Sequence, residues 1–205
     1  MADDYRQASL DIWDQMAAGW EADRREVWES SRPVAEWLVD ALDPQPGETI
    51  LELAAGLGDT GIAAASRLGP SGKLISTDFS VEMVDAARRR AEELGSPNVE
   101  FRTMDAERID LADDSVDGVL CRWGTCSWRT RRPRWPRRAM EWAFESADDH
   151  WHYVMDLAGA IAMVVRSLPE SGQAEIRRLS EERLEPVVTR PGYGLPGLCL
   201  KVLGE

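Results

Sequence analysis

The stretch T-I-L-E-L-A-A-G-L-G-D-T-G, residues 49–61, decides the fold of this chain. Its apolar residues Ile50, Leu51 and Leu53 are typical of a buried parallel strand. Glycines follow, and an alanine-rich helical pattern begins at Ile62. A strand, a glycine turn and a helix in this order form the opening unit of a nucleotide-binding α/β fold, in which the ligand lies against bare backbone at the helix amino terminus.

The spacing of the glycines alone would suit a dinucleotide. Gly56, Gly58 and Gly61 spell G-x-G-x-x-G, and Asp78 follows Gly58 by 20 residues, as an NAD site also requires. The glycine turn could therefore bind NAD, bind a ligand of another kind, or bind nothing.

Two acids favour a ligand without phosphate. Glu52 at the strand end and Asp59 inside the loop would repel a pyrophosphate. S-adenosylmethionine, with its ammonium, sulfonium and ribose, fits these acids better than NAD. We expect Glu52→Gln to weaken S-adenosylmethionine binding and to leave NAD binding unchanged or improved.

Composition narrows the class of protein. A chain of 205 residues fits one domain, and a net charge of −13 argues against nucleic-acid binding. The three cysteines form neither a metal-binding pattern nor an even disulfide set, which suits the cytoplasm. We expect no signal peptide, and no membrane partner because no apolar run approaches the ~20 residues of a membrane span.

Residues 1–45 are predicted to be a helical preface beside the glycine loop. Apolar residues at helical spacing predict one helix over residues 8–28, and Ser31 is expected to cap a second helix that has Pro33 in its first turn. Trp20 and Met16 would either touch a cofactor or pack in the core, and core packing is favoured.

Strands and helices then alternate through residues 46–123, the expected cofactor-binding core. We predict strands over residues 73–77, 99–104 and 116–122, and a helix that Ser80 caps and that ends near Leu94. This order predicts a doubly wound, mostly parallel sheet of Rossmann-like class, with ligands at its carboxyl edge.

Acidic side chains fall at that predicted edge. Asp78 would accept both ribose hydroxyls, and the alternative is a turn or capping aspartate. Asp105 would accept a hydrogen bond from an adenine amino group, and the alternative is a solvated turn acid. Arg122 and Trp123 follow the fourth strand and would line the methyl side of the site.

Four motifs in order carry a family resemblance. They are I-L-E-L-A-A-G-L-G-D-T-G, L-I-S-T-D-F-S-V-E-M-V-D-A-A, F-R-T-M-D-A-E-R-I-D-L and S-V-D-G-V-L-C-R-W-G. Together they resemble class I S-adenosylmethionine-dependent methyltransferases, in particular the ubiquinone/menaquinone-biosynthesis group. The resemblance implies that the amino-acid end of the cofactor contacts Glu52, Ala54, Gly56 and Gly58. It implies that the ribose contacts Asp78, with Phe79 and Met83 nearby, and that the adenine contacts Asp105 and Ala106.

Residues 124–143 depart from the family. Six of the ten residues from Arg129 to Arg138 are arginine, and Pro133 and Pro136 forbid a regular helix. In the family a helix and a fifth strand belong here, and neither is visible in the sequence. A reading-frame error with an internal deletion is favoured over a genuine basic patch for anionic partners.

Residues 144–205 are predicted to form a helical cap and a last strand. One helix would run from Asp148 or Asp149 to Leu168, a second from Ser171 to Leu184, and a strand over residues 198–203 would follow. This gives five strands where the family has seven. His150 and His152 face different sides of the first helix, so no metal site is expected.

The combined prediction is an enzyme that transfers a methyl group from S-adenosylmethionine to a small molecule. Proximity and orientation can do much of this work, so no catalytic residue is named. The alternatives are an impaired remnant, which either still binds the cofactor or is unstable, and, less favoured, an NAD-dependent oxidoreductase. Neither the acceptor nor the oligomeric state is assigned.

Overall fold

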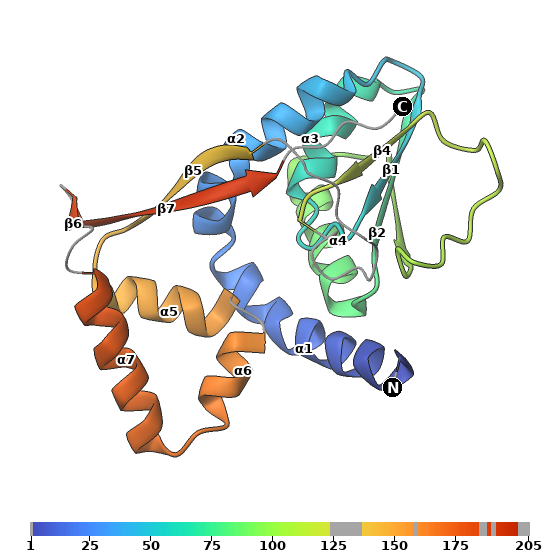
Figure 1. The fold of residues 1–205 in the computed structure, drawn as a ribbon. Coiled ribbons are helices and arrows are strands. Elements are labelled where there is room, and N and C mark those ends of the chain that lie inside the picture. Colours follow the sequence, from blue (N-terminus) through green and yellow to red (C-terminus); the bar gives the residue numbers. More distant parts are fainter. Residues whose placement is uncertain (1, 124–136, 158–159, 185–187, 190–191, 201–205) are drawn as a thin grey trace. The chain divides into compact units, whose positions relative to one another are not determined.

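The computed structural model describes residues 2–123, 137–157, 160–184, 188–189 and 192–200 (Figure 1). The chain divides into two compact units, Met1–Arg131 and Arg132–Glu205. Residues 124–136, for which a basic patch or a frameshift was predicted, lie outside the described residues.

The first unit contains a parallel sheet with strand order β3-β2-β1-β4. Its elements, in chain order, are α1 (Ala2–Ala22), α2 (Arg24–Leu42), β1 (Thr49–Leu53), α3 (Asp59–Leu68), β2 (Lys73–Asp78), α4 (Val81–Leu94), β3 (Val99–Thr103) and β4 (Gly118–Cys121). The predicted α/β class with a parallel, Rossmann-like sheet is confirmed.

Strand β1 is buried on both faces, because its side chains alternate between two clusters. Ile50 packs with α2, α3 and the neighbouring strands, in a cluster that includes Val39 and Leu68. Leu51 and Leu53 face the opposite side, where Ile75 and the segment between β3 and β4 cover them. Glu52 shares the face of Ile50, so its side chain points toward α3.

The N-terminal helices differ from the predicted boundaries. The chain breaks at Asp23, and α2 then continues through Ser31 and Pro33. Ser31 therefore caps no helix; its Oγ donates a hydrogen bond to the carbonyl of Trp28 at 3.4 Å. A proline in a helix interior removes one backbone hydrogen bond. For this reason the sequence predicted that the second helix begins near Pro33 and does not run through it.

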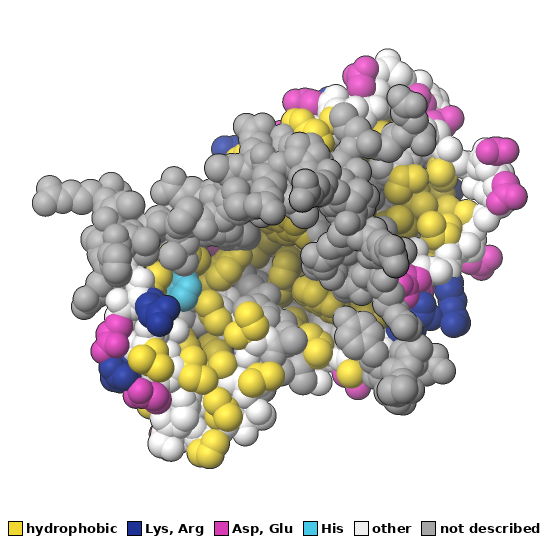
Figure 2. Space-filling model, viewed as in Figure 1, with side chains coloured by type: hydrophobic (Ala, Val, Ile, Leu, Met, Phe, Trp, Pro, Cys, Tyr) yellow, Lys and Arg dark blue, Asp and Glu magenta, His cyan; other side chains and the backbone are white. Residues whose placement is uncertain are grey.

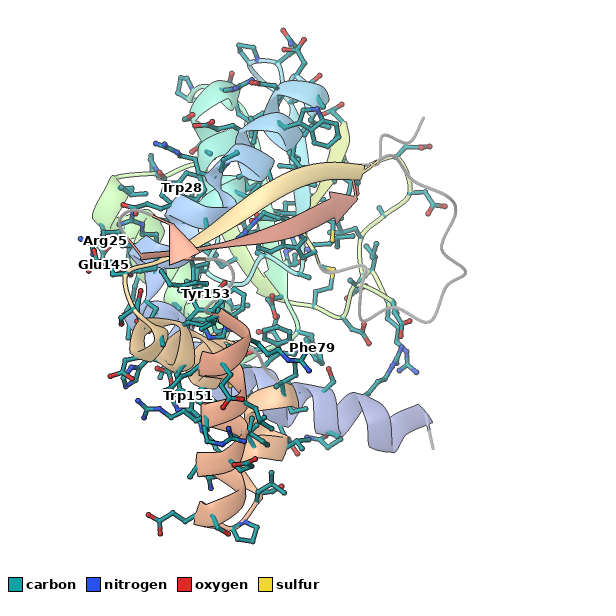
Figure 3. All side chains as sticks on the ribbon, turned by 60° about the vertical axis from the view of Figure 1, so that its left-hand side comes forward. Arg25, Trp28, Phe79, Glu145, Trp151 and Tyr153 are labelled. Carbon is teal, nitrogen blue, oxygen red and sulfur yellow. The ribbon has the colours of Figure 1, made fainter. Side chains whose placement is uncertain are left out.

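The second unit contains an antiparallel sheet with strand order β5-β7-β6. Its elements are β5 (Arg137–Phe144), α5 (Ala147–Leu157), α6 (Ala160–Arg166), α7 (Glu170–Leu184), β6 (Val188–Thr189) and β7 (Gly192–Leu200). The Phe144 ring meets Tyr153 of α5 edge-on, with centroids 5.1 Å apart (Tyr153 is labelled in Figure 3), and meets His150 at 5.0 Å. The aromatic contacts of Phe144 thus fix the end of β5 against α5.

Several predictions for this unit are wrong. The long helix predicted to reach Leu168 is two helices, α5 and α6, and the cap of α5 is Ser146, whose Oγ accepts from the Asp149 N–H at 3.0 Å. The last described strand, β7, begins at Gly192 and not at Leu198, and the predicted end at residue 203 lies outside the described residues; β5 is a strand where none was expected. The described residues hold seven strands in two sheets, not five in one.

The helices of the second unit keep apolar side chains on their surface. Figure 2 shows hydrophobic side chains over α5, α6 and α7 on the face in view. Ile161 and Val164 are each 62% exposed, and Leu179 is 45% exposed. No helix in the described residues combines the length and apolar character that crossing a bilayer requires.

Candidate cofactor site

The glycine loop between β1 and α3 is a tight turn with an unusual backbone. Ala54, Gly56 and Gly58 have positive φ angles of 50°, 56° and 80°. The loop is closed by its own bond from the Gly58 N–H to the Ala55 carbonyl at 3.0 Å, and the Ala55 N–H donates to the Thr77 carbonyl of β2 at 2.9 Å. These bonds hold the loop over the carboxyl ends of β1 and β2.

Gly56, Gly58 and Gly61 differ in what a side chain at each position would contact. A Cβ added at Gly56 would meet nothing within 4 Å, so this backbone borders open space where a ligand can lie. A Cβ at Gly58 would come 2.8 Å from the Cβ of Ala87, so Gly58 permits the loop to approach α4. A Cβ at Gly61 would overlap the carboxylate of Glu52. Of the three glycines, only Gly56 therefore borders open space.

Glu52 lies beneath the loop, with 2% of its surface exposed. Its Oε1 accepts the Gly61 N–H in the first turn of α3 at 2.7 Å, and its Oε2 accepts the Ser76 hydroxyl at 2.8 Å. Burial raises the pKa of Glu52 to about 7, although these two hydrogen bonds and the nearby Arg122 oppose the rise. Both oxygens thus bind protein donors, and contact of Glu52 with a cofactor remains a prediction.

Asp78 ends β2 and joins the glycine loop. Its Oδ2 accepts the Gly56 N–H at 2.9 Å, and its Oδ1 accepts the Ser80 N–H at 3.0 Å. Burial raises the pKa of Asp78, against the lowering effect of the Ser80 and Gly56 N–H groups. The carboxylate that we expect to bind the ribose is therefore beside Gly56, the residue whose backbone borders open space.

The start of α4 follows the predicted pattern. Ser80 is its N-cap, and the Ser80 Oγ accepts the Met83 N–H at 3.2 Å. Met83 is buried in a cluster with Leu57 of the loop, and Phe79 is half-buried between β2 and the cap. Phe79, labelled in Figure 3, directly follows the last residue of β2 in the sequence. Phe79 and Met83 thus lie near Asp78, and their contact with a cofactor remains a prediction.

Asp105 lies on the neighbouring strand end and is only half-buried. Its Oδ2 pairs with Arg6 of α1 at 3.3 Å, and its Oδ1 accepts the Glu107 N–H at 2.8 Å. The Met104 N–H donates to the Asp78 carbonyl at 2.8 Å, which ties the end of β3 to that of β2. Ala106 follows and packs against the cluster that contains Leu51.

Arg122 lies at the end of β4, on the other side of β1. Its Nε donates to Thr60 Oγ1 in the first turn of α3 at 2.8 Å, and its guanidinium lies 4.5 Å from the Trp123 ring centroid. Trp123 has a φ of 65°, rare for an aromatic residue. The positive charge of Arg122 therefore lies at the N-terminal turn of α3, near Glu52.

Trp20 packs against a cluster that includes Leu57 of the glycine loop. It lies with Trp13 beside a cluster of Ala17, Leu57, Met83 and Ala86, and the two indole rings meet edge-on with centroids 5.7 Å apart. This is the core packing that was favoured over a cofactor contact. The Trp20 Nε1 is buried and has no hydrogen-bond partner among the described residues.

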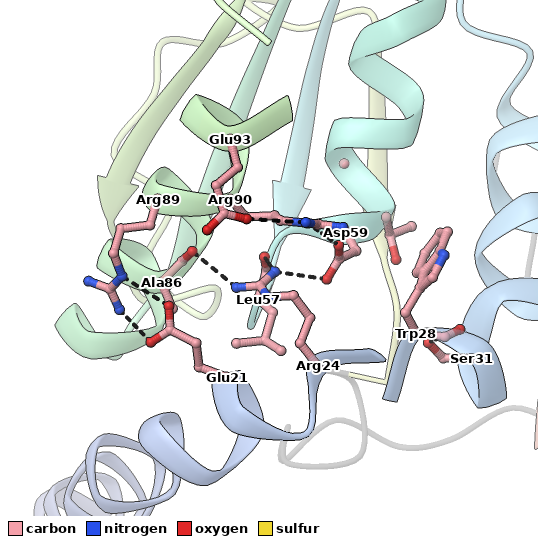
Figure 4. A network of polar contacts seen from close by, with 12 residues as sticks. Glu21, Arg24, Trp28, Ser31, Leu57, Asp59, Ala86, Arg89, Arg90 and Glu93 are labelled. Carbon is pink, nitrogen blue, oxygen red and sulfur yellow. Dashed lines mark hydrogen bonds and ion pairs between the residues drawn. The ribbon is translucent and has the colours of Figure 1, made fainter. Parts of the chain in front are cut away.

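The prediction that Asp59 would repel a pyrophosphate is wrong. The Asp59 carboxylate, with 9% of its side chain exposed, pairs with Arg24 at 3.0 Å and with Arg90 at 3.2 Å (Figure 4). A carboxylate between two arginines does not repel a pyrophosphate as a bare one would. The charge of Asp59 therefore does not discriminate between S-adenosylmethionine and NAD. The two arginines that neutralise it come from α2 and α4.

The predicted site residues thus gather at one edge of the sheet. The loop residues, Asp78 and its neighbours Phe79 and Met83 lie together, Asp105 follows on the next strand, and Arg122 lies across β1. No three Asp, Glu, His or Cys side chains in the described parts of the chain come together as a metal site would need. Sequence reasoning missed Arg24, which contacts the loop directly.

The sequence of the chain matches the methyltransferase domain family over residues 44–185, more than half of its length. The chain belongs to this family. The resemblance to S-adenosylmethionine-dependent methyltransferases is thereby confirmed, and the match includes the glycine loop, Asp78, Asp105 and Arg122.

Named methyltransferases are among the similar proteins. Nocamycin O-methyltransferase of Saccharothrix syringae is 35% identical over 53% of this chain and 38% of its own length. Aklanonic acid methyltransferase of Streptomyces sp. (strain C5) is 31% identical over 57% of this chain and 51% of its own. Demethylmenaquinone methyltransferase of Beutenbergia cavernae is 38% identical over 42% of this chain and 32% of its own length. The chain thus spans at most about half of these curated relatives.

Solved structures resemble the chain more distantly. A S-adenosylmethionine-dependent methyltransferase from Aquifex aeolicus aligns with 61% of this chain and 73% of its own, at 20% identity and a TM-score of 0.47. The YcgJ protein of Bacillus subtilis aligns with 61% and 59%, at 22% identity and a TM-score of 0.42.

Proposed function

We propose that this chain binds S-adenosylmethionine at the glycine loop and transfers its methyl group to a small-molecule acceptor. Membership in the methyltransferase family supports the chemistry, and relatives named for nocamycin, aklanonic acid and demethylmenaquinone support a small acceptor. The net charge of −13 disfavours a nucleic-acid acceptor. We also propose a cytoplasmic location, supported by three cysteines in no even set.

The observation that carries this proposal is the pairing of Gly56 with Asp78. The backbone of Gly56 borders open space, and its N–H is bound by the Asp78 carboxylate at 2.9 Å. A ligand lying on Gly56 would therefore meet Asp78, whose oxygens each retain a lone pair for a ribose hydroxyl. Residues at this edge fit the cofactor: bare backbone for its amino-acid end, Asp78 for its ribose and Asp105 for its adenine.

The bound cofactor would supply an activated methyl group on its sulfonium. What the chain itself would do is hold that methyl in line with the acceptor, since orientation alone lowers the barrier strongly. The loop, fixed by its bonds to β2, sets the cofactor end of this geometry. No residue is assigned as a base.

Ligand-dependent thermal unfolding tests the proposal. S-adenosylhomocysteine at ~100 times its dissociation constant should stabilise the protein by about 2.7 kcal/mol, and NAD should not. Stabilisation by NAD alone would favour an oxidoreductase. Absence of any ligand effect on a cooperative transition would contradict cofactor binding by this chain, and absence of cooperative unfolding would favour an impaired remnant.

A pair of glycine variants makes the test specific. Gly56 and Gly95 have φ angles of 56° and 65°, and a Cβ at either meets nothing within 4 Å. Alanine therefore costs a similar backbone strain at each, about 1–2 kcal/mol. Only Gly56→Ala places a methyl group in the proposed cofactor space, so it should abolish the ligand shift while Gly95→Ala, at the end of α4, retains it.

A further inference from the structure

Arg24, the first residue of α2, makes three hydrogen bonds with groups far along the chain. Its Nη1 donates to the Leu57 carbonyl and to Asp59 Oδ2, both at 3.0 Å, and its Nη2 donates to the Ala86 carbonyl at 3.1 Å (Figure 4). One guanidinium thus joins an N-terminal helix, the glycine loop and α4.

Leu57 is the central residue of the loop. It lies between Gly56 and Gly58, which both have positive φ. Because glycine has no Cβ, the backbone on either side of Leu57 can adopt many other conformations. Its side chain is 2% exposed and packs with Ala17 and Met83. The side chain of Leu57 is thus held by α1 and α4, while its carbonyl is held by Arg24.

The ion pair beside this bond is shielded from water. The side chains of Arg24 and Asp59 are 13% and 9% exposed, and Arg90 Nε donates to the other oxygen of Asp59 at 3.2 Å. Hydrogen bonds and ion pairs in such surroundings are stronger and less screened than those on a surface. Arg24 is therefore held firmly enough to fix the carbonyl that it binds.

We propose that Arg24 is a positioning residue that holds the glycine loop in its cofactor-binding conformation through the carbonyl of Leu57. Its effect on cofactor affinity rests on the proposed function, whereas its effect on the loop does not. Asp59→Asn, which weakens the hold on Arg24, and Arg89→Met, which does not, separate this role from general stability. Asp59→Asn removes the ion pair but leaves the two carbonyl bonds of Arg24 in place.

Arg89 provides the matched control. Its Nε and Nη2 donate to the Glu21 carboxylate at 2.9 and 2.6 Å, so it also joins an N-terminal helix to α4, but it binds no loop residue among the described contacts. If Arg24 merely attaches the helices, Arg89→Met should have a comparable effect. If it positions the loop, the Arg24 variants should change ligand affinity and Arg89→Met should not.

The first experiment measures S-adenosylhomocysteine affinity by calorimetry, at a temperature where every variant is folded. We expect Arg24→Met to weaken binding at least tenfold and Arg24→Lys, which keeps the charge but loses the fork of donors, to weaken it less. Arg89→Met should stay within threefold of the parent chain, and Asp59→Asn, which removes the ion pair that helps to hold Arg24, should weaken binding less than Arg24→Met does. Equal losses for Arg24→Met and Arg89→Met would overturn the proposal, and Arg24→Lys serves if Arg24→Met fails to fold.

The second experiment needs no ligand. Amide hydrogen exchange of Gly56 and Gly58 should accelerate at least tenfold in Arg24→Met and remain unchanged in Arg89→Met. Unchanged exchange in Arg24→Met would overturn the proposal. If the parent chain binds no S-adenosylhomocysteine, the proposed function fails, and the exchange rates still decide whether Arg24 positions the loop.

Discussion

Replacing Glu52 by glutamine should make the protein more stable at alkaline pH. The buried carboxyl of Glu52 has a pKa of about 7, against an ordinary value of 4.5. Because the folded state favours the protonated acid, the free energy of unfolding falls as pH rises from about 4.5 to 7 and the loss is complete above 7. The difference between the two pKa values corresponds to about 3 kcal/mol.

Glutamine removes the charge and keeps the contacts. Its amide oxygen can accept the Gly61 N–H, and its amino group can donate to the Ser76 hydroxyl. Between pH 5 and pH 8 the stability advantage of Glu52→Gln over the parent chain should therefore grow by between about 2 and 3 kcal/mol. Urea unfolding followed by tryptophan fluorescence at pH 5, 6, 7 and 8 measures this growth.

Glu100→Gln is the control. Hydrogen bonds with Arg102 and Lys73 lower the pKa of the Glu100 carboxyl, so the stability that it contributes is lost only as pH falls below its ordinary range. The difference between Glu100→Gln and the parent chain should thus be constant from pH 5 to pH 8. A constant difference for Glu52→Gln as well would refute a raised pKa for Glu52.

Three further changes test the backbone around the site. Ala54→Gly should raise stability by about 0.5–1 kcal/mol in urea unfolding, since φ at Ala54 is 50° and glycine adopts this region freely; a loss would contradict strain at Ala54. Ser80→Ala should lower the free energy of unfolding by about 1 kcal/mol through loss of the α4 cap; no change would show that the cap is dispensable. Gly61→Ala should cost about 3 kcal/mol because its methyl group overlaps Glu52. Combined with Glu52→Ala it should cost less than the two single changes together, and simple additivity would refute the overlap.

The alternation of strands and helices could be predicted from the sequence wherever local signals agree. The cap at Ser80 was predicted correctly, and Asp78 ends its strand as predicted, because each signal lies within a few residues of the element that it marks. At β5 the local signals mislead, since arginines and prolines before it suggest irregular chain. What settles β5 is its pairing with β7, about 55 residues later.

The candidate site shows the same division. The glycines and Asp78 each follow or end one of two adjacent parallel strands, so their proximity follows from the parallel sheet. The neutralisation of Asp59 does not, because Arg24 and Arg90 reach it from 35 and 31 residues away. Sequence distance hides which charges meet, and the reading of Asp59 as a free acid was wrong for that reason.

The packing of α1 has a consequence for the order in which the protein folds during synthesis. The partners of Trp13 and Trp20 include Leu57, Met83 and Ala86, which leave the ribosome long after α1 itself. A single helix without tertiary contacts is only marginally stable in water. Trp13 and Trp20, among the first residues to be synthesised, therefore lack most of their packing partners until α4 has been synthesised.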